Sequence, residues 1–268
     1  MDKLEYKDLL DAGVHFGHLT RKWNPKMAPY IFMERNGIHV IDLNKTLAAL
    51  GEAQQAIKNI VRSGRKVMFV ATKKQAKDIV AEEARRLNMP YVTERWLGGM
   101  LTNFTTIRKS LKKMSGIEKM MKDESYTNLA KRERLMISRE KDKLSKVLGG
   151  IADLTRLPAA LFVVDIKREH IAVNEAIKLN IPVFAIVDTN SDPNLADFPI
   201  PANDDAFKSI SIITKAIGKA VEEALLERKQ DKEDSKLKEE EKKKRRVDEE
   251  GEEQETAEVG ESKESSEE

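Results

Sequence analysis

The sequence contains no cysteine among its 268 residues, and this absence excludes two kinds of site. Without thiols the chain can form no disulfide bond and offers no thiolate ligand to zinc or to an iron–sulfur cluster. Any metal site would have to use histidine and carboxylate ligands, and the chain has only four histidines.

Long hydrophobic runs are also absent. The longest apolar stretches, such as Leu161–Val164, are far shorter than the roughly 20 residues that a membrane-spanning helix needs. The first residues, Met1-Asp2-Lys3-Leu4-Glu5, lack the apolar core of a signal peptide. We therefore expect a cytosolic protein with no membrane partner.

Glycine-rich phosphate loops are missing where a nucleotide-binding protein would have one. The apolar run at 67–71 is followed by Thr72-Lys73-Lys74-Gln75-Ala76, which has neither a Gly-x-Gly-x-x-Gly pattern nor a Gly-Lys-Ser/Thr pattern. Lys73 and Lys74 could still bind a phosphate at the start of the next helix, or they could simply be solvated. Lysine at this position opposes the helix dipole, so we favour the phosphate role.

Charged residues, in contrast, are abundant at 35% of the chain, well above the usual level of about 25%. The net charge of +2 conceals an uneven distribution, because residues 247–268 carry −10 and residues 1–246 therefore carry +12. A basic body favours nucleic acid or an anionic surface as its partner. Residues 229–268 have too few apolar side chains to form a core, so we expect a disordered, mainly acidic tail.

Strand and helix patterns alternate along most of the chain. The predicted strands cover 67–71, 91–93, 159–165 and 182–188, with a fifth starting near Ile200. The predicted helices cover 44–61, 74–87, 170–179 and 207–226, preceded by a short helix at 4–11, a loop-rich segment at 12–37 and a strand at 38–41. Unalternating apolar strands separated by helices indicate an α/β protein with a parallel sheet and right-handed crossovers.

Residues 103–148 interrupt this alternation with two helical segments and no strand pattern. Apolar residues at 104, 107, 111, 114 and 121 fall near heptad spacing, and Asp123–Asn128 supplies a turn. The segment carries 13 basic and 6 acidic residues, so it is strongly basic. We predict an inserted helical hairpin that packs as a coiled coil. The expected divisions are an arm at 1–43, an α/β domain at 44–102 and 149–228, the hairpin at 103–148 and the tail at 229–268.

Two aspartates and three histidines are the candidates for chemistry. Asp165 and Asp188 each end a predicted strand, where they could bind a metal ion, accept a phosphoryl group, or cap the following turn. We favour capping, because the sequence offers no evident third acidic ligand. His15, His18 and His39 lie in a glycine-containing region and are more readily explained as structural histidines than as metal ligands.

A basic segment with one aromatic residue, Arg21-Lys22-Trp23-Asn24-Pro25-Lys26, favours RNA as the partner. Its cations can pair with phosphates, whereas Trp23 could stack on a base or anchor the loop on the core. A second tryptophan, Trp96, precedes the Gly98-Gly99 pair, and we expect it to be buried.

Several long blocks of the sequence together resemble one protein family. These blocks are Gly13-Val14-His15-Phe16-Gly17-His18, Trp23-Asn24-Pro25-Lys26-Met27, Asn36–Leu43, Thr72–Ala76, Arg95–Asn103 and Pro158–Asp165, followed by Glu169, Glu175 and Asn180-Ile181-Pro182. In their order and content they are similar to the bacterial ribosomal protein S-two family of the small subunit. The resemblance runs from about residue 4 to residue 226.

The resemblance implies a flavodoxin-like, three-layer domain with a five-stranded parallel sheet in the order 2-1-3-4-5 and an inserted antiparallel coiled-coil hairpin. It also implies a structural role near the junction of head and body of the small subunit. The expected partners are small-subunit ribosomal RNA and neighbouring ribosomal proteins, including the large mRNA-binding protein. No catalysis, cofactor, metal or small-molecule substrate is expected.

The residues that we predict to contact ribosomal RNA are mostly basic. They are Arg21, Lys22, Trp23, Lys26, Lys73, Lys74, Arg95, Asn103, Arg108, Lys109, Lys112 and Lys113. One rival hypothesis is a nucleotide- or metal-dependent α/β enzyme that uses Asp165, Asp188 and Lys73. Another is a free-standing coiled-coil adaptor.

Overall fold

A computed structural model of the chain describes residues 4–123, 126, 129–231 and 233. The chain divides into two compact units, residues 1–224 and 225–268. The first unit holds both sheets and nearly all the helices. In the second unit residues 225–231 are helical, and most of the predicted acidic tail lies outside the described residues.

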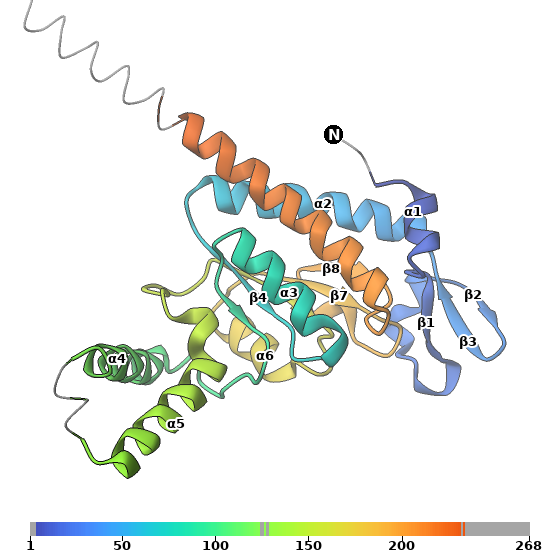
Figure 1. The fold of residues 1–268 in the computed structure, drawn as a ribbon. Helices are drawn as coiled ribbons and strands as arrows, with labels where there is room; N and C mark the ends of the chain where they lie inside the picture. Colours follow the sequence, from blue (N-terminus) through green and yellow to red (C-terminus); the bar gives the residue numbers. More distant parts are fainter. Residues whose placement is uncertain (1–3, 124–125, 127–128, 232, 234–268) are drawn as a thin grey trace, which may run out of the picture. The chain divides into compact units, whose positions relative to one another are not determined.

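A five-stranded sheet forms the centre of the first unit (Figure 1). Its strands in spatial order are β5 (Tyr91–Val92), β4 (Val67–Val70), β6 (Ala160–Val164), β7 (Val183–Val187) and β8 (Phe198–Pro201). All four neighbouring pairs are parallel. Numbered along the chain, these core strands have the order 2-1-3-4-5, which confirms the flavodoxin-like arrangement that the resemblance implied.

A row of phenylalanines crosses this sheet. Phe69 pairs with Phe162, Phe162 with Phe184, and Phe184 with Phe198 in the parallel register. The Phe184 and Phe198 rings stack at 4.5 Å, and the Phe69 and Phe162 rings are tilted at 5.4 Å. Strands β4, β6 and β7 are fully buried on both faces, which explains why their sequences read as continuous apolar runs.

Helices cover both faces of the sheet. Figure 1 shows α3 (Lys74–Arg86) and the helix that starts at residue 207 crossing in front of the strands. Helix α2 (Leu43–Arg62) begins where the Asp42 side chain accepts a hydrogen bond from the Asn44 N–H, and it packs against β8. On the opposite face α6 (His170–Lys178) buries small apolar residues against β4, β6 and β7.

The N-terminal arm corrects the prediction of a loop-rich segment at 12–37. After α1 (Tyr6–Asp11), an antiparallel sheet forms in the order β1 (Phe16–Leu19), β3 (Ile38–Ile41) and β2 (Ile31–Arg35). The glycines and prolines that suggested loops flank or interrupt these very short strands. Gly17 sits so close to its surroundings that a Cβ there would lie 2.7 Å from Thr189 Cγ2.

The predicted helical insertion is present as α4 (Phe104–Met120) and α5 (Lys131–Leu148), which contact each other. Helix α4 buries apolar residues on one side, namely Ile107, Leu111, Met114 and Ile117, whereas α5 has one buried residue, Leu148. The turn predicted at 123–128 lies partly outside the described residues. Coiled-coil packing of the two helices stays a prediction. No helix in the described part of the chain is long and apolar enough to cross a membrane.

Candidate nucleic-acid interface

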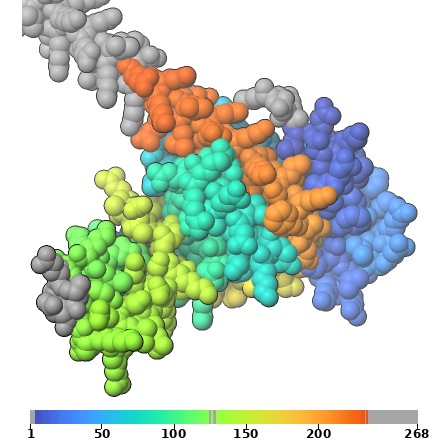
Figure 2. Space-filling view, viewed as in Figure 1, coloured from blue at the N-terminus to red at the C-terminus, as the bar shows by residue number. Residues whose placement is uncertain are grey.

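Helix α4 presents a row of cations to solvent. Arg108, Lys109 and Lys112 are exposed, and among the described residues none of them lies within ion-pair distance of a carboxylate. Lys113 is also exposed and pairs with Glu140 of α5. Because positions three and four apart share a helix face, these side chains form one positive surface opposite the buried apolar side of α4. The hairpin that carries this surface is green in Figure 2.

A buried carboxylate holds the segment that leads into α4. Glu175 Oε1 accepts hydrogen bonds from Trp96 Nε1 (3.1 Å) and the Gly99 N–H (2.7 Å). Its Oε2 accepts from the Leu101 N–H (2.9 Å), the Thr102 N–H (3.0 Å) and the Thr102 hydroxyl (3.2 Å). Burial alone would raise the pKa of Glu175, but these hydrogen bonds hold it below its ordinary value. Trp96 is 6% exposed, which confirms the prediction that it is buried.

Two predicted RNA contacts lie in or next to this segment. The Arg95 side chain is exposed beside the buried Trp96. Asn103 precedes α4, and its Oδ1 accepts hydrogen bonds from the hydroxyls of Thr106 (2.9 Å) and Thr105 (3.3 Å). Asn103 therefore already has a local structural role, and RNA contact by either residue stays a prediction.

The basic segment of the arm also lies at the surface. Arg21 and Lys22 are exposed in the short 3-10 helix Thr20–Lys22. Lys26 is exposed as well, and its Nζ pairs with Asp192 Oδ2 at 2.6 Å. The Trp23 side chain is 38% exposed, and its ring centroid lies 5.1 Å from that of His39. Trp23 thus contacts the arm on one side and solvent on the other, so both of its predicted roles remain open.

Lys73 differs from the other predicted RNA contacts because it is buried. Its Nζ lies 2.7 Å from Asp204 Oδ1, 2.6 Å from Asp205 Oδ1 and 3.5 Å from Asp165 Oδ2. Burial lowers the pKa of Lys73, but the surrounding carboxylates more than offset this, so its pKa is raised. The ammonium is already neutralised within the protein, and this geometry does not favour a phosphate contact. The neighbouring Lys74 is exposed.

Asp165 has the local bonding that capping predicts, whereas the Asp188 side chain contacts Thr189 and His18. Asp165 Oδ1 accepts a hydrogen bond from the Arg168 N–H at 3.0 Å, and its backbone has a positive φ of 68°. Asp188 Oδ1 accepts from the N–H of Thr189, and Asp188 Oδ2 lies 3.0 Å from His18 Nδ1. These contacts give both aspartates a structural role.

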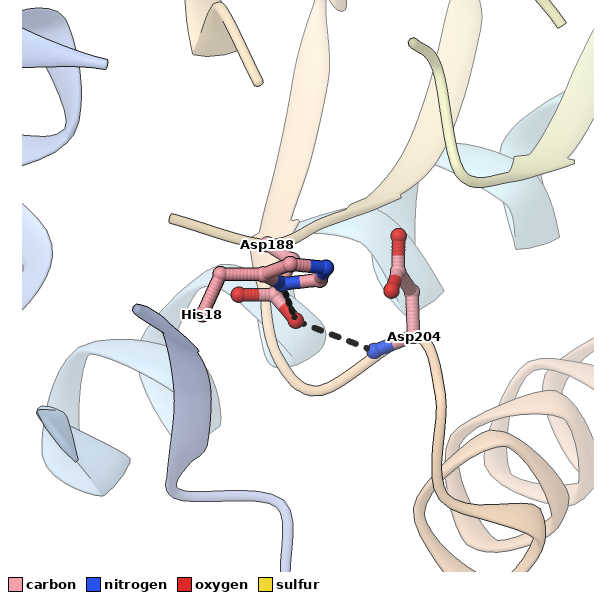
Figure 3. A group of neighbouring side chains, drawn as sticks. All are labelled: His18, Asp188 and Asp204. Carbon is pink, nitrogen blue, oxygen red and sulfur yellow. Dashed lines mark hydrogen bonds and ion pairs between the residues drawn. The ribbon is translucent and has the colours of Figure 1, made fainter. Parts of the chain in front are cut away.

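A third carboxylate, which the sequence reasoning missed, lies beside Asp188. Figure 3 shows His18, Asp188 and Asp204 converging, and one ligand atom from each lies within 4.8 Å of the others. Asp204 follows β8, whose neighbour in the sheet is β7, the strand that ends before Asp188. The sequence feature that could have revealed Asp204 was the Asn203-Asp204-Asp205 run after the fifth strand, because adjacent parallel strands end at the same edge of a sheet.

The electrostatics of this group are unusual. Burial raises the pKa of Asp204 to about 7, and the neighbouring Asp188 and Asp165 charges add to this effect. The pKa of His18 is raised chiefly by its hydrogen bond to Asp188. Asp204 Oδ2 is buried and has no hydrogen-bond partner among the described residues. One imidazole and two carboxylates are suitable ligands for Zn²⁺ or a similar divalent cation, although Lys73 already supplies positive charge here.

The arm also exposes an apolar face. In the antiparallel register Phe16 and Met33 both pair with Val40, and Leu19 pairs with Ile38. None of these five side chains is buried, and Phe32 beside them is 70% exposed. Exposed apolar side chains gathered on one face are typical of protein–protein contact sites.

Comparisons with known proteins show which family this chain belongs to. The family model described as "Ribosomal protein S2" matches residues 9–224. The "Small ribosomal subunit protein uS2" of Cytophaga hutchinsonii is 77% identical over 237 residues, covering 88% of this chain and 93% of that protein. The proteins of the same name from Flavobacterium johnsoniae and Parabacteroides distasonis are 65% and 62% identical, covering 87% and 89% of this chain and 91% and 86% of their own lengths. This chain therefore belongs to the ribosomal protein S2 family, whose members are structural proteins of the small ribosomal subunit.

Proposed function

We propose that this protein is a non-catalytic constituent of the small ribosomal subunit that binds ribosomal RNA near the junction of head and body, within cytoplasmic ribosomes. The observation that carries the proposal is the cationic face of α4, where Arg108, Lys109 and Lys112 are exposed and unpaired among the described residues. Such cations release counterions when they meet phosphates, which makes RNA binding favourable and salt-dependent.

The arm supplies a second part of the proposal. Arg21 and Lys22 extend the basic surface, and the apolar face around Phe16 and Met33 lies in the same sheet-containing arm. We assign RNA contact to the cations and docking of neighbouring ribosomal proteins, including the large mRNA-binding protein, to the apolar face. The division follows from chemistry, because aliphatic side chains gain little from phosphates but gain from burial against protein.

Incorporation into subunits tests the RNA contact. Arg108, Lys109, Lys112 and Lys113 are replaced together by glutamate, and the tagged chain is followed through a sucrose gradient with intact small subunits. We expect the variant to shift from the subunit fractions to the top of the gradient, and more so at higher salt. The variant should still unfold cooperatively, because these side chains are exposed.

The matched control replaces four exposed lysines that lie outside the hairpin and the arm. These are Lys167, Lys178, Lys208 and Lys215. The control has one lysine more and one arginine fewer, but the change in net charge is the same. Equal loss from the subunits in both variants would show that net charge, and not the face of α4, determines incorporation.

A further inference from the structure

A small polar cavity lies at the edge of the sheet opposite to the His18 group. Its accessible volume is about 230 Å³, and it opens between the start of β4 and β5 and the turn Gly149–Ile151 that follows α5. Its lining comes chiefly from two segments, residues 85–91 and residues 149–154. Pockets for drug-sized ligands have about 300–1,000 Å³, so this one suits a smaller group.

Two cations line the cavity, Lys66 and Arg85, and both are exposed. Within the described part of the chain neither is paired with a carboxylate, and Asp153 is the one acidic residue in the lining. The Arg85 guanidinium is held in place, since its Nε donates to the Tyr91 hydroxyl at 2.7 Å and its carbon lies 5.2 Å from the Tyr91 ring centre. The two terminal amino groups of Arg85 take no part in that hydrogen bond, and together they can donate to two oxygens of a phosphate.

Apart from Asn88, Tyr91 and Asp153, the rest of the lining is apolar or lacks side chains. Met89, Ile151 and Leu154 are buried residues that contribute an apolar wall. Gly150 has no room for a side chain, because a Cβ there would lie 2.2 Å from the Tyr91 carbonyl oxygen. The cavity thus combines two cations at its mouth with an apolar wall and a side-chain-free backbone segment.

We propose that this cavity binds the phosphate and sugar of one nucleotide, with the phosphate on Lys66 and Arg85, the sugar against the apolar wall and the base outside the cavity. The nucleotide is either one residue of ribosomal RNA or a free mononucleotide, since both present the same groups. The RNA form rests on the proposed function, whereas binding of a free mononucleotide does not. Lys66 precedes β4 and Arg85 lies in α3, so an RNA contact here would use different residues from those of α4.

Calorimetric titration of the full chain with adenosine monophosphate, and separately with adenosine, tests the free-ligand form. We expect the monophosphate to bind more tightly than adenosine, and its affinity to fall at least about tenfold in a Lys66→Gln/Arg85→Gln double variant, since both charged contacts are lost. The control is an Arg35→Gln/Lys208→Gln variant, which removes the same two residue types elsewhere and should bind normally. If the double variant unfolds, Lys66→Gln alone replaces it, because no described contact involves that side chain.

Cross-linking of 4-thiouridine-labelled ribosomal RNA in intact subunits tests the RNA form. Cross-linked peptides that cover residues 85–91 or 149–154, and that disappear in the double variant, would support it. Monophosphate binding without these cross-links assigns the cavity to a free nucleotide. Absence of both, or monophosphate binding that the double variant does not weaken, overturns the proposal. If the four-residue α4 variant still loses incorporation in that case, the proposed ribosomal function stands while this inference fails.

Discussion

Replacing Glu175 by alanine should destabilise the protein more than most single substitutions. The change removes the acceptor for donors on Trp96, Gly99, Leu101 and Thr102. The N–H groups of Gly99 and Thr102 belong to partly exposed residues, so water can replace their lost hydrogen bonds. Trp96 Nε1 and the Leu101 N–H are buried and would lose their acceptor. An unsatisfied buried donor costs about 1–3 kcal/mol, so two of them cost about 2–6 kcal/mol, a large part of the usual 5–15 kcal/mol of a domain.

Urea unfolding of the full chain measures this loss, and amide hydrogen exchange at residues 99–102 localises it. Glu175→Gln is the matched variant, since it keeps one acceptor oxygen but places an NH₂ group among donors, and it should fall between alanine and wild type. A loss below about 1 kcal/mol for Glu175→Ala, with unchanged exchange at 99–102, would refute the reasoning.

The pH dependence of stability follows from the same contacts. The pKa of Glu175 is below its ordinary value of 4.5 in the folded protein, so the ionised carboxylate stabilises the fold at pH above 4.5. This contribution is lost as pH falls through the lowered folded pKa. The loss of stability below pH 4.5 should therefore be smaller in Glu175→Gln than in wild type.

Two further substitutions probe the buried charges and the arm. Lys73→Met leaves Asp204 and its neighbours without their cation, and we expect a loss of about 3–5 kcal/mol in urea unfolding, against almost none for the exposed Lys74→Met. Equal stabilities would show that the carboxylates accept protons at no cost. Gly17→Ala forces a Cβ to within 2.7 Å of Thr189 Cγ2, so the melting temperature should drop by an amount equivalent to about 1–3 kcal/mol. An alanine variant as stable as wild type would contradict the close packing of β1.

The sequence predicted the α/β domain well because its signals are local. Continuous apolar runs marked β4, β6 and β7, and helix-period apolar spacing marked α2 and α3 within two residues of their ends. In the arm, β3 was predicted at 38–41, but β1, β2 and their pairing into a sheet were missed. These strands have only four and five residues, and their pairing depends on distant contacts such as that of Gly17 with Thr189. No periodicity within four residues can report such a contact.

Candidate site residues were predictable by type but not by environment. Exposure of Arg108 and Lys109 follows from their helix positions opposite the apolar stripe. Lys73 also lies in a basic stretch of sequence, yet its side chain is buried. Its ammonium pairs with three carboxylates that lie 92, 131 and 132 positions further along the chain. That contact exists only once β4, β6 and β8 lie in one sheet, so only the fold could show it.

At the carboxyl edge of this sheet, the donors that could bind a phosphate are already paired within the protein. Related architectures place phosphates beyond the end of the first strand, where backbone N–H groups are unpaired. Here the Glu169 carboxylate takes the place that a phosphate would have. Its Oε1 accepts hydrogen bonds from the Thr72 N–H at 2.8 Å and from the Thr72 hydroxyl at 2.5 Å. Lys73, which the sequence suggested as a phosphate-binding group, is paired with Asp204. Internal carboxylates thus use donors that a phosphate would need, whereas among the described residues exposed cations without a carboxylate partner occur on α4, in the arm and at the opposite edge of the sheet.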